Sequence, residues 1–278
     1  MAASGNGDPV ISAAVQTRGR TRGADYAFLG EAPENPWWRT YGGYTTFEHP
    51  TILLHSDGEC WEAFLSGIPS RRRDAVGTTI RFTLVLSGSA AEAGPVLALI
   101  GAWLGDIVGT GHVVADALDA VFGEPDVERL LANPDDSDVE GRVLDLLTAL
   151  PPGPTVAAAA SPPDWLWTLE VPEARDAFLL QAGELLDGHA GRALLLNLVG
   201  SPTDVEPLLR DPRTLAVLGT DLDPALVALP RGTPPGKAPA PSRGTARRIR
   251  TELRAAMVLV AILVVTLVAT LGGLIWNR

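Results

Sequence analysis

Between residues 24 and 90, hydrophobic positions alternate with polar ones at the two-residue period that is typical of β-strands. The clearest runs are TILLHS at 51–56, ECWEAFLS at 59–66 and TTIRFTLVLSG at 78–88, with weaker candidates at 26–29 and 44–47. Asp57-Gly58 separates the first two runs and favours a two-residue type I′ hairpin turn. The pattern predicts a compact antiparallel, β-rich part over residues 24–90.

Beyond residue 90 the hydrophobic spacing changes to the helical period. Helices are expected at 94–108, 112–122, 125–132, 137–150 and 172–186, and a short one is expected to begin at Ser201-Pro202. The runs at 155–160, 192–199 and 214–220 are short and wholly apolar, as a parallel sheet covered on both faces requires. We therefore expect a helical and α/β part over residues 91–228. Whether this part shares one core with the β-rich part stays open.

The two ends of the chain follow neither pattern. Residues 1–23 have no apolar period and predict a disordered N-terminal arm, and residues 229–249 form a linker rich in Pro, Gly and Ala. Residues 255–276 contain no charged side chain. A helix of that length spans about 33 Å, enough to cross a hydrocarbon core of about 30 Å. We expect one C-terminal transmembrane helix behind an α+β or α/β cytoplasmic region.

The residues around the predicted span indicate its orientation. Four arginines precede it (Arg247, Arg248, Arg250 and Arg254), whereas Arg278 is the only basic residue after it, and Trp276 suits the far interface. The first residues lack the basic start and long apolar core of a secretory signal. The sequence therefore predicts a single-pass, tail-anchored protein of the bacterial inner membrane, with its N-terminus in the cytoplasm.

Composition narrows the partners. Eight of the 22 Lys and Arg residues, but only one of the 33 Asp and Glu residues, lie in 231–278, so the remainder of the chain is strongly acidic. An acidic body disfavours nucleic acid as a partner. One cysteine excludes a disulfide scaffold and a thiolate zinc cluster, and agrees with a reducing compartment. No phosphate-loop motif is present, and we expect neither a cofactor nor a metal.

The predicted hairpin brings together three side chains that could carry chemistry. With Asp57-Gly58 as the turn, His55 lies directly opposite Cys60, close enough for an imidazole to hold a thiolate. Glu62 would pair with Leu53 on the same face and could orient the ring. This is a minimal arrangement for a cysteine nucleophile, although any hairpin pairs whatever residues flank its turn.

The most distinctive run is GIPSRRRDAVGTTIR, residues 67–81. Arg71, Arg73, Asp74 and Arg81 in this run could grip a phosphate or carboxylate, or form the edge of a protein interface, for which arginine is well suited. A solvated loop with a weak Arg–Asp pair is the simpler alternative.

The same run resembles a segment of a known family. Ile-Pro-x-x-Arg-x-Asp-x-x-Gly-x-x-Ile, beginning at Ile68 and followed by a predicted strand, is similar to part of the N-terminal domain of GTPase-associated proteins of bacterial conflict (defence) systems. The resemblance covers roughly residues 40–90. It implies a regulatory domain that works with a partner GTPase, sometimes at the membrane.

These observations lead to two functional hypotheses. The first is a membrane-tethered protein-interaction or regulatory module that is not an enzyme, with a protein partner that could be a GTPase. The alternative is a membrane-bound hydrolase or nucleotide-dependent effector that uses His55 and Cys60, or the Arg71–Asp74 loop.

Overall fold

The computed structural model describes residues 11–20, 25–90, 93–109, 111–134, 138–152, 167–169, 172–199, 202–211 and 213–219. They belong to the first of the two units into which the chain divides, Met1–Gly232. The apolar run at 155–160, the linker, the predicted transmembrane helix at 255–276 and its flanking residues (Arg247, Arg248, Arg250, Arg254 and Trp276) lie outside the described residues.

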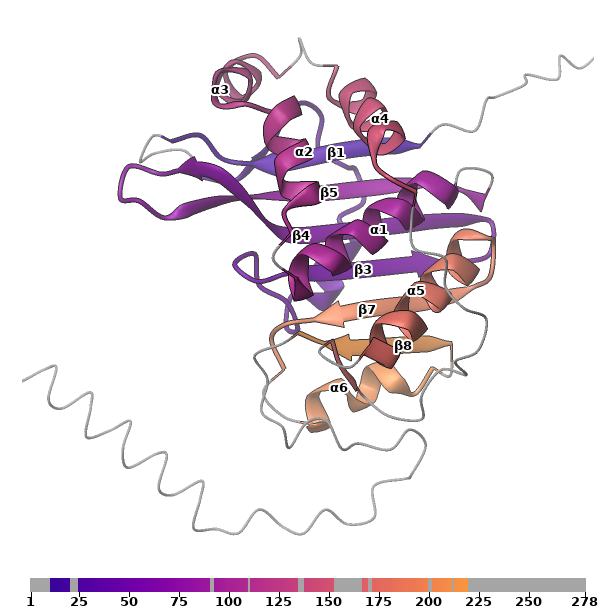
Figure 1. Ribbon diagram of the computed structural model, residues 1–278. Coiled ribbons are helices and arrows are strands. Elements are labelled where there is room, and N and C mark those ends of the chain that lie inside the picture. The colour runs from indigo at the N-terminus through magenta and orange to yellow at the C-terminus, as the bar shows by residue number, and fades with distance from the viewer. Residues whose placement is uncertain are drawn as a thin grey trace, which may run out of the picture. The chain divides into compact units, whose positions relative to one another are not determined.

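The strands of the described residues form one eight-stranded sheet in the order β2-β1-β5-β4-β3-β7-β8-β6. Figure 1 shows the part of this order from β1 to β8. They are β1 (Ser12–Thr17), β2 (Ala27–Phe28), β3 (Thr51–Ser56), β4 (Cys60–Arg73), β5 (Thr79–Ser89), β6 (Trp167–Thr168), β7 (Gly191–Leu196) and β8 (Thr214–Leu218). The strands expected at 51–56, 59–66, 78–88, 192–199 and 214–220 are confirmed as β3, β4, β5, β7 and β8.

The sheet is mixed, which makes the fold α+β. Neighbouring strands from β2 through β7 are antiparallel, whereas β8 runs parallel to both β7 and β6. β7 pairs with β3, so that His55 lies opposite Arg192. The antiparallel part and the α/β part of the chain therefore share one sheet.

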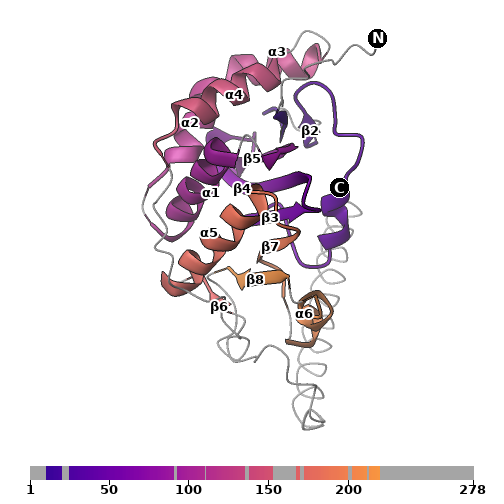
Figure 2. The ribbon, with the colours of Figure 1, turned by 90° about the vertical axis from the view of Figure 1, so that its right-hand side faces the viewer.

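Helices cover both faces of this sheet. They are α1 (Ala93–Val108), α2 (Val113–Val121), α3 (Glu124–Ala132), α4 (Val139–Ala149), α5 (Pro172–Leu186), α6 (Pro202–Leu209) and the 3₁₀ helix η1 (Trp37–Tyr41). Figure 2 shows α1, α2, α4 and α5 on one side of the sheet and α6 on the other. The six α-helices lie where the sequence predicts them, within a few residues at each end.

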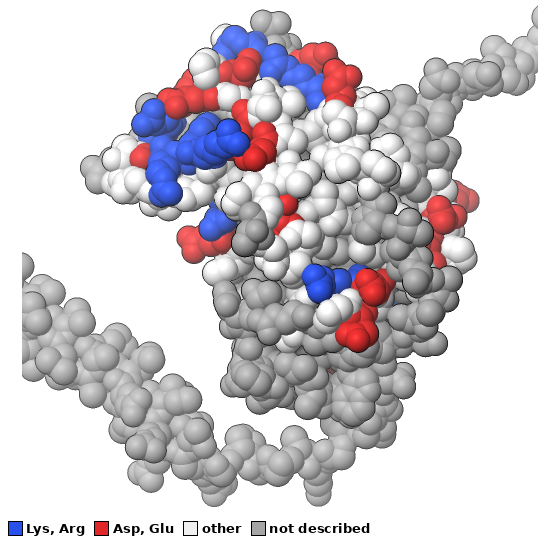
Figure 3. Space-filling view, in the orientation of Figure 1, with Lys and Arg blue, Asp and Glu red and all other residues white. Residues whose placement is uncertain are grey.

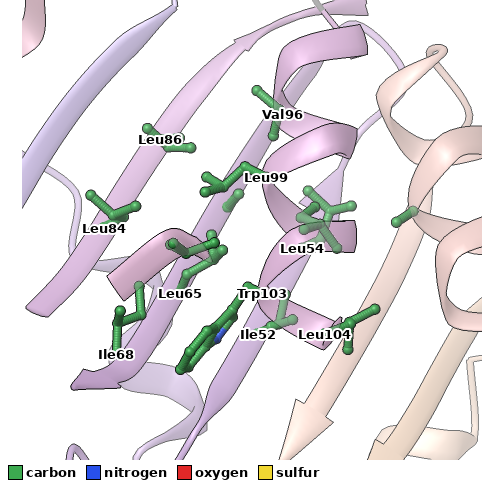
Figure 4. Close-up of a cluster of buried hydrophobic side chains, with 14 of the residues drawn as sticks. Ile52, Leu54, Leu65, Ile68, Leu84, Leu86, Val96, Leu99, Trp103 and Leu104 are labelled. Atoms are coloured by element: carbon green, nitrogen blue, oxygen red, sulfur yellow. The ribbon is translucent and has the colours of Figure 1, made fainter. Parts of the chain in front are cut away.

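The larger core lies between α1 and the centre of the sheet (Figure 4). Val96, Leu99 and Trp103 of α1 pack there against side chains from β3, β4 and β5. On the other face a smaller cluster forms around Trp38, Phe64 and Val85. Because burying each such side chain contributes roughly 1.5–3 kcal/mol, these two layers hold the central strands in place.

Two sequence predictions need correction. Residues 1–23 were expected to be disordered, but Ser12–Thr17 form β1, which pairs with β5 and buries Ala13, Val15 and Thr17. The prediction was wrong because Ser and Ala carry a weak strand signal, so the alternation in SAAVQT is faint. The weak strand candidate at 44–47 is a turn, in which the carbonyl of Tyr44 accepts hydrogen bonds from Asn197 and Leu198.

Candidate functional site

The β4–β5 hairpin extends past its neighbours in the sheet. β3 pairs with β4 only as far as Ser66, and β1 pairs with β5 only from Thr83 onward. Residues 67–81 therefore form a two-stranded projection, here called the arm, seen at the left of Figure 1. Gly67 lies at the base of the arm, within a bulge of β4, with a φ of +79°.

The tip of the arm is a closed turn. The Asp74 carboxylate accepts hydrogen bonds from the backbone N–H groups of Val76 (3.0 Å) and Thr78 (2.8 Å), and it also forms an ion pair with Arg18. Gly77, with a φ of +89°, completes the turn. Partial burial alone would raise the pKa of Asp74, but the Thr78 and Val76 N–H groups and Arg18 outweigh it, so the pKa lies below its ordinary value.

Arg72 is buried in the arm and supports it from within. Its guanidinium donates to the Ser70 and Thr17 hydroxyls at 3.0 and 2.7 Å and to the Arg18 carbonyl at 3.0 Å. It also lies 4.8 Å from the centre of the Phe82 ring. Burial lowers the pKa of Arg72, and the nearby carboxylates of Asp119, Glu128 and Glu124 offset that shift only in part. Arg72 thus holds β1 and β4 together and is not available to a partner.

The arginines of the arm that were predicted to bind a ligand or partner make contacts other than those of Arg72. Arg71 pairs with Asp116 of α2 at 2.6 Å, Arg73 donates to the Gly77 carbonyl, and Arg81 donates to the Gly67 carbonyl. Arg71 and Arg73 are exposed because they alternate with buried Arg72 along β4. Figure 3 shows the arginines of this end of the molecule interleaved with acidic side chains.

Sequence reasoning missed the acidic residues that hold this region. Asp119 of α2 accepts hydrogen bonds from the Ser70 hydroxyl and from the Arg71 N–H group. Glu124 of α3 pairs with Arg20 at 2.7 Å, and Glu128 accepts from the Arg20 N–H group at 2.9 Å. These acids lie about 50 to 100 residues from their partners, and no local pattern indicates the pairing.

The residues that carry the family resemblance have structural roles in the arm. Ile68 and Ile80 are fully buried, Arg72 links β1 to β4, and Asp74 and Gly77 close the turn. The motif therefore describes how this hairpin folds. The exposed Arg71 and Arg73 occupy its variable positions.

At the other end of β4, the hairpin register differs from the prediction. Asp57 N–H donates to the Cys60 carbonyl, so Gly58-Glu59 are the two central residues of the turn. His55 then faces Glu62, and it does not lie opposite Cys60. The predicted type I′ turn at Asp57-Gly58 is wrong because it needs a positive φ at both residues, and only Gly58 has one, at +104°.

The Asp57 side chain favours this shifted turn. Its carboxylate accepts hydrogen bonds from the N–H groups of Glu59 (2.9 Å) and Cys60 (2.8 Å). The bond from Cys60, followed by the bond from Glu59, is the main reason why the pKa of Asp57 lies below its ordinary value. Cys60 is exposed within the turn.

His55, Cys60 and Glu62 still line one cavity of about 540 Å³, together with Asp57, Trp61 and Ser87–Ser89. The distance from His55 Nδ1 to Glu62 Oε2 is 3.9 Å, too long for a hydrogen bond. Burial raises the pKa of Glu62, and His55 opposes that shift. The structure therefore pairs the imidazole with a carboxylate and places the thiol outside that pair.

Within the described part of the chain, no group of three or more His, Cys, Asp or Glu side chains is placed to hold a metal ion. Over the same residues no single helix is long and apolar enough to cross a membrane. Helices α1 and α2 are long and apolar enough only when they are taken together, and the chain bends by 115° between them.

Comparison with known proteins gives no relative: no family model, curated protein or solved structure matches this chain.

Proposed function

We propose that this chain is a tail-anchored protein of the bacterial inner membrane whose cytoplasmic region is a protein-interaction and regulatory module. The observation that carries the proposal is the arm, which extends past the sheet and ends in a closed turn with an exposed apolar residue. Val76 at that tip has 66% of its surface exposed, the largest fraction among the exposed large hydrophobic side chains of the described residues.

The arm suits recognition because its shape is fixed before contact. Arg72 holds its base, and Asp74 holds its tip. A pre-ordered element loses less conformational entropy on binding than a flexible loop does. Arginine beside an apolar residue is a combination that protein interfaces favour.

The proposed partner is a GTPase. This part of the proposal rests on the resemblance of the segment that forms the arm to domains that work with a partner GTPase. The anchor at residues 255–276 would raise the local concentration of the interaction at the membrane without adding contacts.

Site-directed cross-linking tests the partner contact. The chain has a single cysteine, so a Cys60→Ser background allows one new thiol to be labelled with a photoactivatable cross-linker. Val76→Cys should give a discrete adduct with a GTP-hydrolysing protein in membranes of the native bacterium. Leu198→Cys, at a side chain that is 49% exposed after β7, is the matched control. Equal adducts from both positions, or none from Val76→Cys, would contradict the proposal.

Fractionation tests the anchor. The full chain should sediment with the membranes, and a variant that lacks residues 250–278 should stay in the supernatant. Protease added to intact spheroplasts should leave the cytoplasmic region uncut. Recovery of the full chain in the high-speed supernatant would contradict the tail anchor.

A further inference from the structure

A second cavity, of about 430 Å³, lies on the sheet face that carries η1. Its lining is rich in aromatic side chains: Tyr26, Phe28, Trp38, Phe47 and Phe64. Two pairs of rings are nearly parallel, Tyr26 with Phe47 at 6.0 Å and Trp38 with Phe64 at 5.4 Å between centroids. The volume lies within the range of small-molecule sites, which are mostly apolar with a few polar groups.

Two polar side chains on the sheet side of this cavity have no hydrogen-bond partner among the described residues. Ser66 of β4 is only 1% exposed, and Gln16 of β1 is half-buried. Within the described residues, neither the Ser66 hydroxyl nor the Gln16 side-chain amide makes a hydrogen bond, although both residues line the cavity. Buried polar groups are normally paired, so an unpaired hydroxyl at a cavity wall indicates a group that a ligand can satisfy.

The charges at the cavity disfavour an ionic ligand. Asp25 and Arg39 both line it and both are exposed, so a cation meets Arg39 and an anion meets Asp25. Trp38 and Phe64 are buried against each other, so the flat apolar surface offered to an uncharged ring comes from Tyr26, Phe28 and Phe47, which are at least partly exposed. A ring that also carries donors and acceptors on its edge can bond to Ser66 and Gln16.

From these observations we propose that this cavity binds an uncharged, planar heteroaromatic ring, of the kind found in a nucleoside, with its polar edge toward Ser66 and Gln16. Phe47, which is 44% exposed, would cover the ring from the open side. The inference is independent of the arm and its partner, since it concerns a different set of residues.

Calorimetric titration of the full chain in detergent micelles tests the proposal, with adenosine, guanosine, cytidine and uridine as probes. At least one nucleoside should bind with one-to-one stoichiometry. Choline tests a cation at the aromatic surface, and inorganic phosphate tests an anion at Arg39. Binding of choline or phosphate with no nucleoside binding would overturn the proposal.

Variants connect the binding to the cavity. Phe47→Ala should weaken nucleoside binding about tenfold, as loss of a stacking side chain does. Ser66→Ala, which keeps the wall and removes the hydroxyl, should weaken it about fivefold. Val113→Ala changes a side chain on α2 that is also 44% exposed, and it should leave the affinity unchanged. Unchanged affinity in both cavity variants, or an equal loss in Val113→Ala, would overturn the assignment. A circular dichroism spectrum matching the parent chain confirms that each variant is folded.

Discussion

Strand β4 begins and ends in turns built with the same two residue types, and the two turns are used differently. At each, an Asp carboxylate accepts two backbone N–H groups and a glycine takes a positive φ: Asp57 with Gly58, and Asp74 with Gly77. The Asp57 turn lies where β3 and β4 pair, within the sheet. The Asp74 turn lies beyond the neighbouring strands, where Arg18 pairs with its carboxylate and Arg72 supports the base of the arm. The comparison indicates that the same local turn needs contacts with side chains distant in sequence when it ends a projecting hairpin. In the arm, Arg18 and Arg72 take part in these contacts.

The largest expected effect comes from breaking the base of the arm. A Cβ atom on Gly67 would lie 2.3 Å from the His49 carbonyl oxygen, and the φ of +79° is unfavourable for alanine. Gly67→Ala should therefore lower the free energy of unfolding by at least about 3 kcal/mol, measured by urea denaturation. Gly77→Ala is the control, because its Cβ meets nothing within 4 Å, and it should cost about 1 kcal/mol. Equal losses would show that Gly67 is not sterically restricted.

The second effect separates the buried arginine from its exposed neighbour. Arg72→Ala removes three hydrogen bonds and leaves a cavity over Phe82, so it should lower the free energy of unfolding by about 3 kcal/mol. Arg71→Ala removes one exposed ion pair and should cost about 0.5 kcal/mol. Chemical denaturation of both variants measures the difference. A loss for Arg71→Ala as large as that for Arg72→Ala would contradict the assigned roles.

The pH dependence sharpens the comparison between the two aspartates. Both have a pKa in the folded chain below the value in the unfolded chain, so each contributes stability above about pH 4, which is lost as the pH falls through the folded pKa. Asp74→Asn should reduce the loss of folding stability at low pH more than Asp57→Asn does. The reason is that, of the two carboxylates, only that of Asp74 also forms an ion pair with an arginine. Urea titrations at pH 6, 4 and 3 measure the slopes. A steeper acid-side loss in Asp74→Asn than in the parent chain would be the opposite of this expectation.

The smallest effect concerns the thiol. Because His55 faces Glu62 and Cys60 lies in the turn, His55→Ala should change the rate of Cys60 alkylation by iodoacetamide less than about twofold, since no imidazole holds the thiolate. The chain has no other cysteine, so incorporation of label reports this site directly. A tenfold slower reaction in the variant would restore the cysteine hypothesis.

Much of the fold could be predicted from the local pattern of hydrophobic and polar residues. The candidate site depends on hairpin register and on contacts between distant parts of the chain, which that pattern does not encode. The strand periods of β3, β5 and β7 and the helical periods of α1 and α5 are strong, and these elements lie where they are predicted. β1 was missed because its alternation uses small residues, which give little signal until β5 supplies a partner.

The errors at the site have a similar origin. Moving the turn by one residue, from Asp57-Gly58 to Gly58-Glu59, changes every pair in the hairpin, and the choice depends on where Asp57 finds donors. Burial of Arg72 among three arginines follows from strand alternation once the register is known. Its acceptors on β1 and the acids on α2 and α3 come from remote parts of the chain, so periodicity alone could not place them.

The pairing of β3 with β7 has a consequence for biosynthesis. When β3 leaves the ribosome, its neighbour β7 has not yet been synthesised, because the residue opposite His55 is Arg192. The hydrogen-bonding edge of β3 therefore stays open while about half of the chain is translated, and an open apolar edge attracts other strands. Truncation anywhere before β7 would leave this edge exposed for good, so prematurely terminated products should depend on chaperones or be degraded.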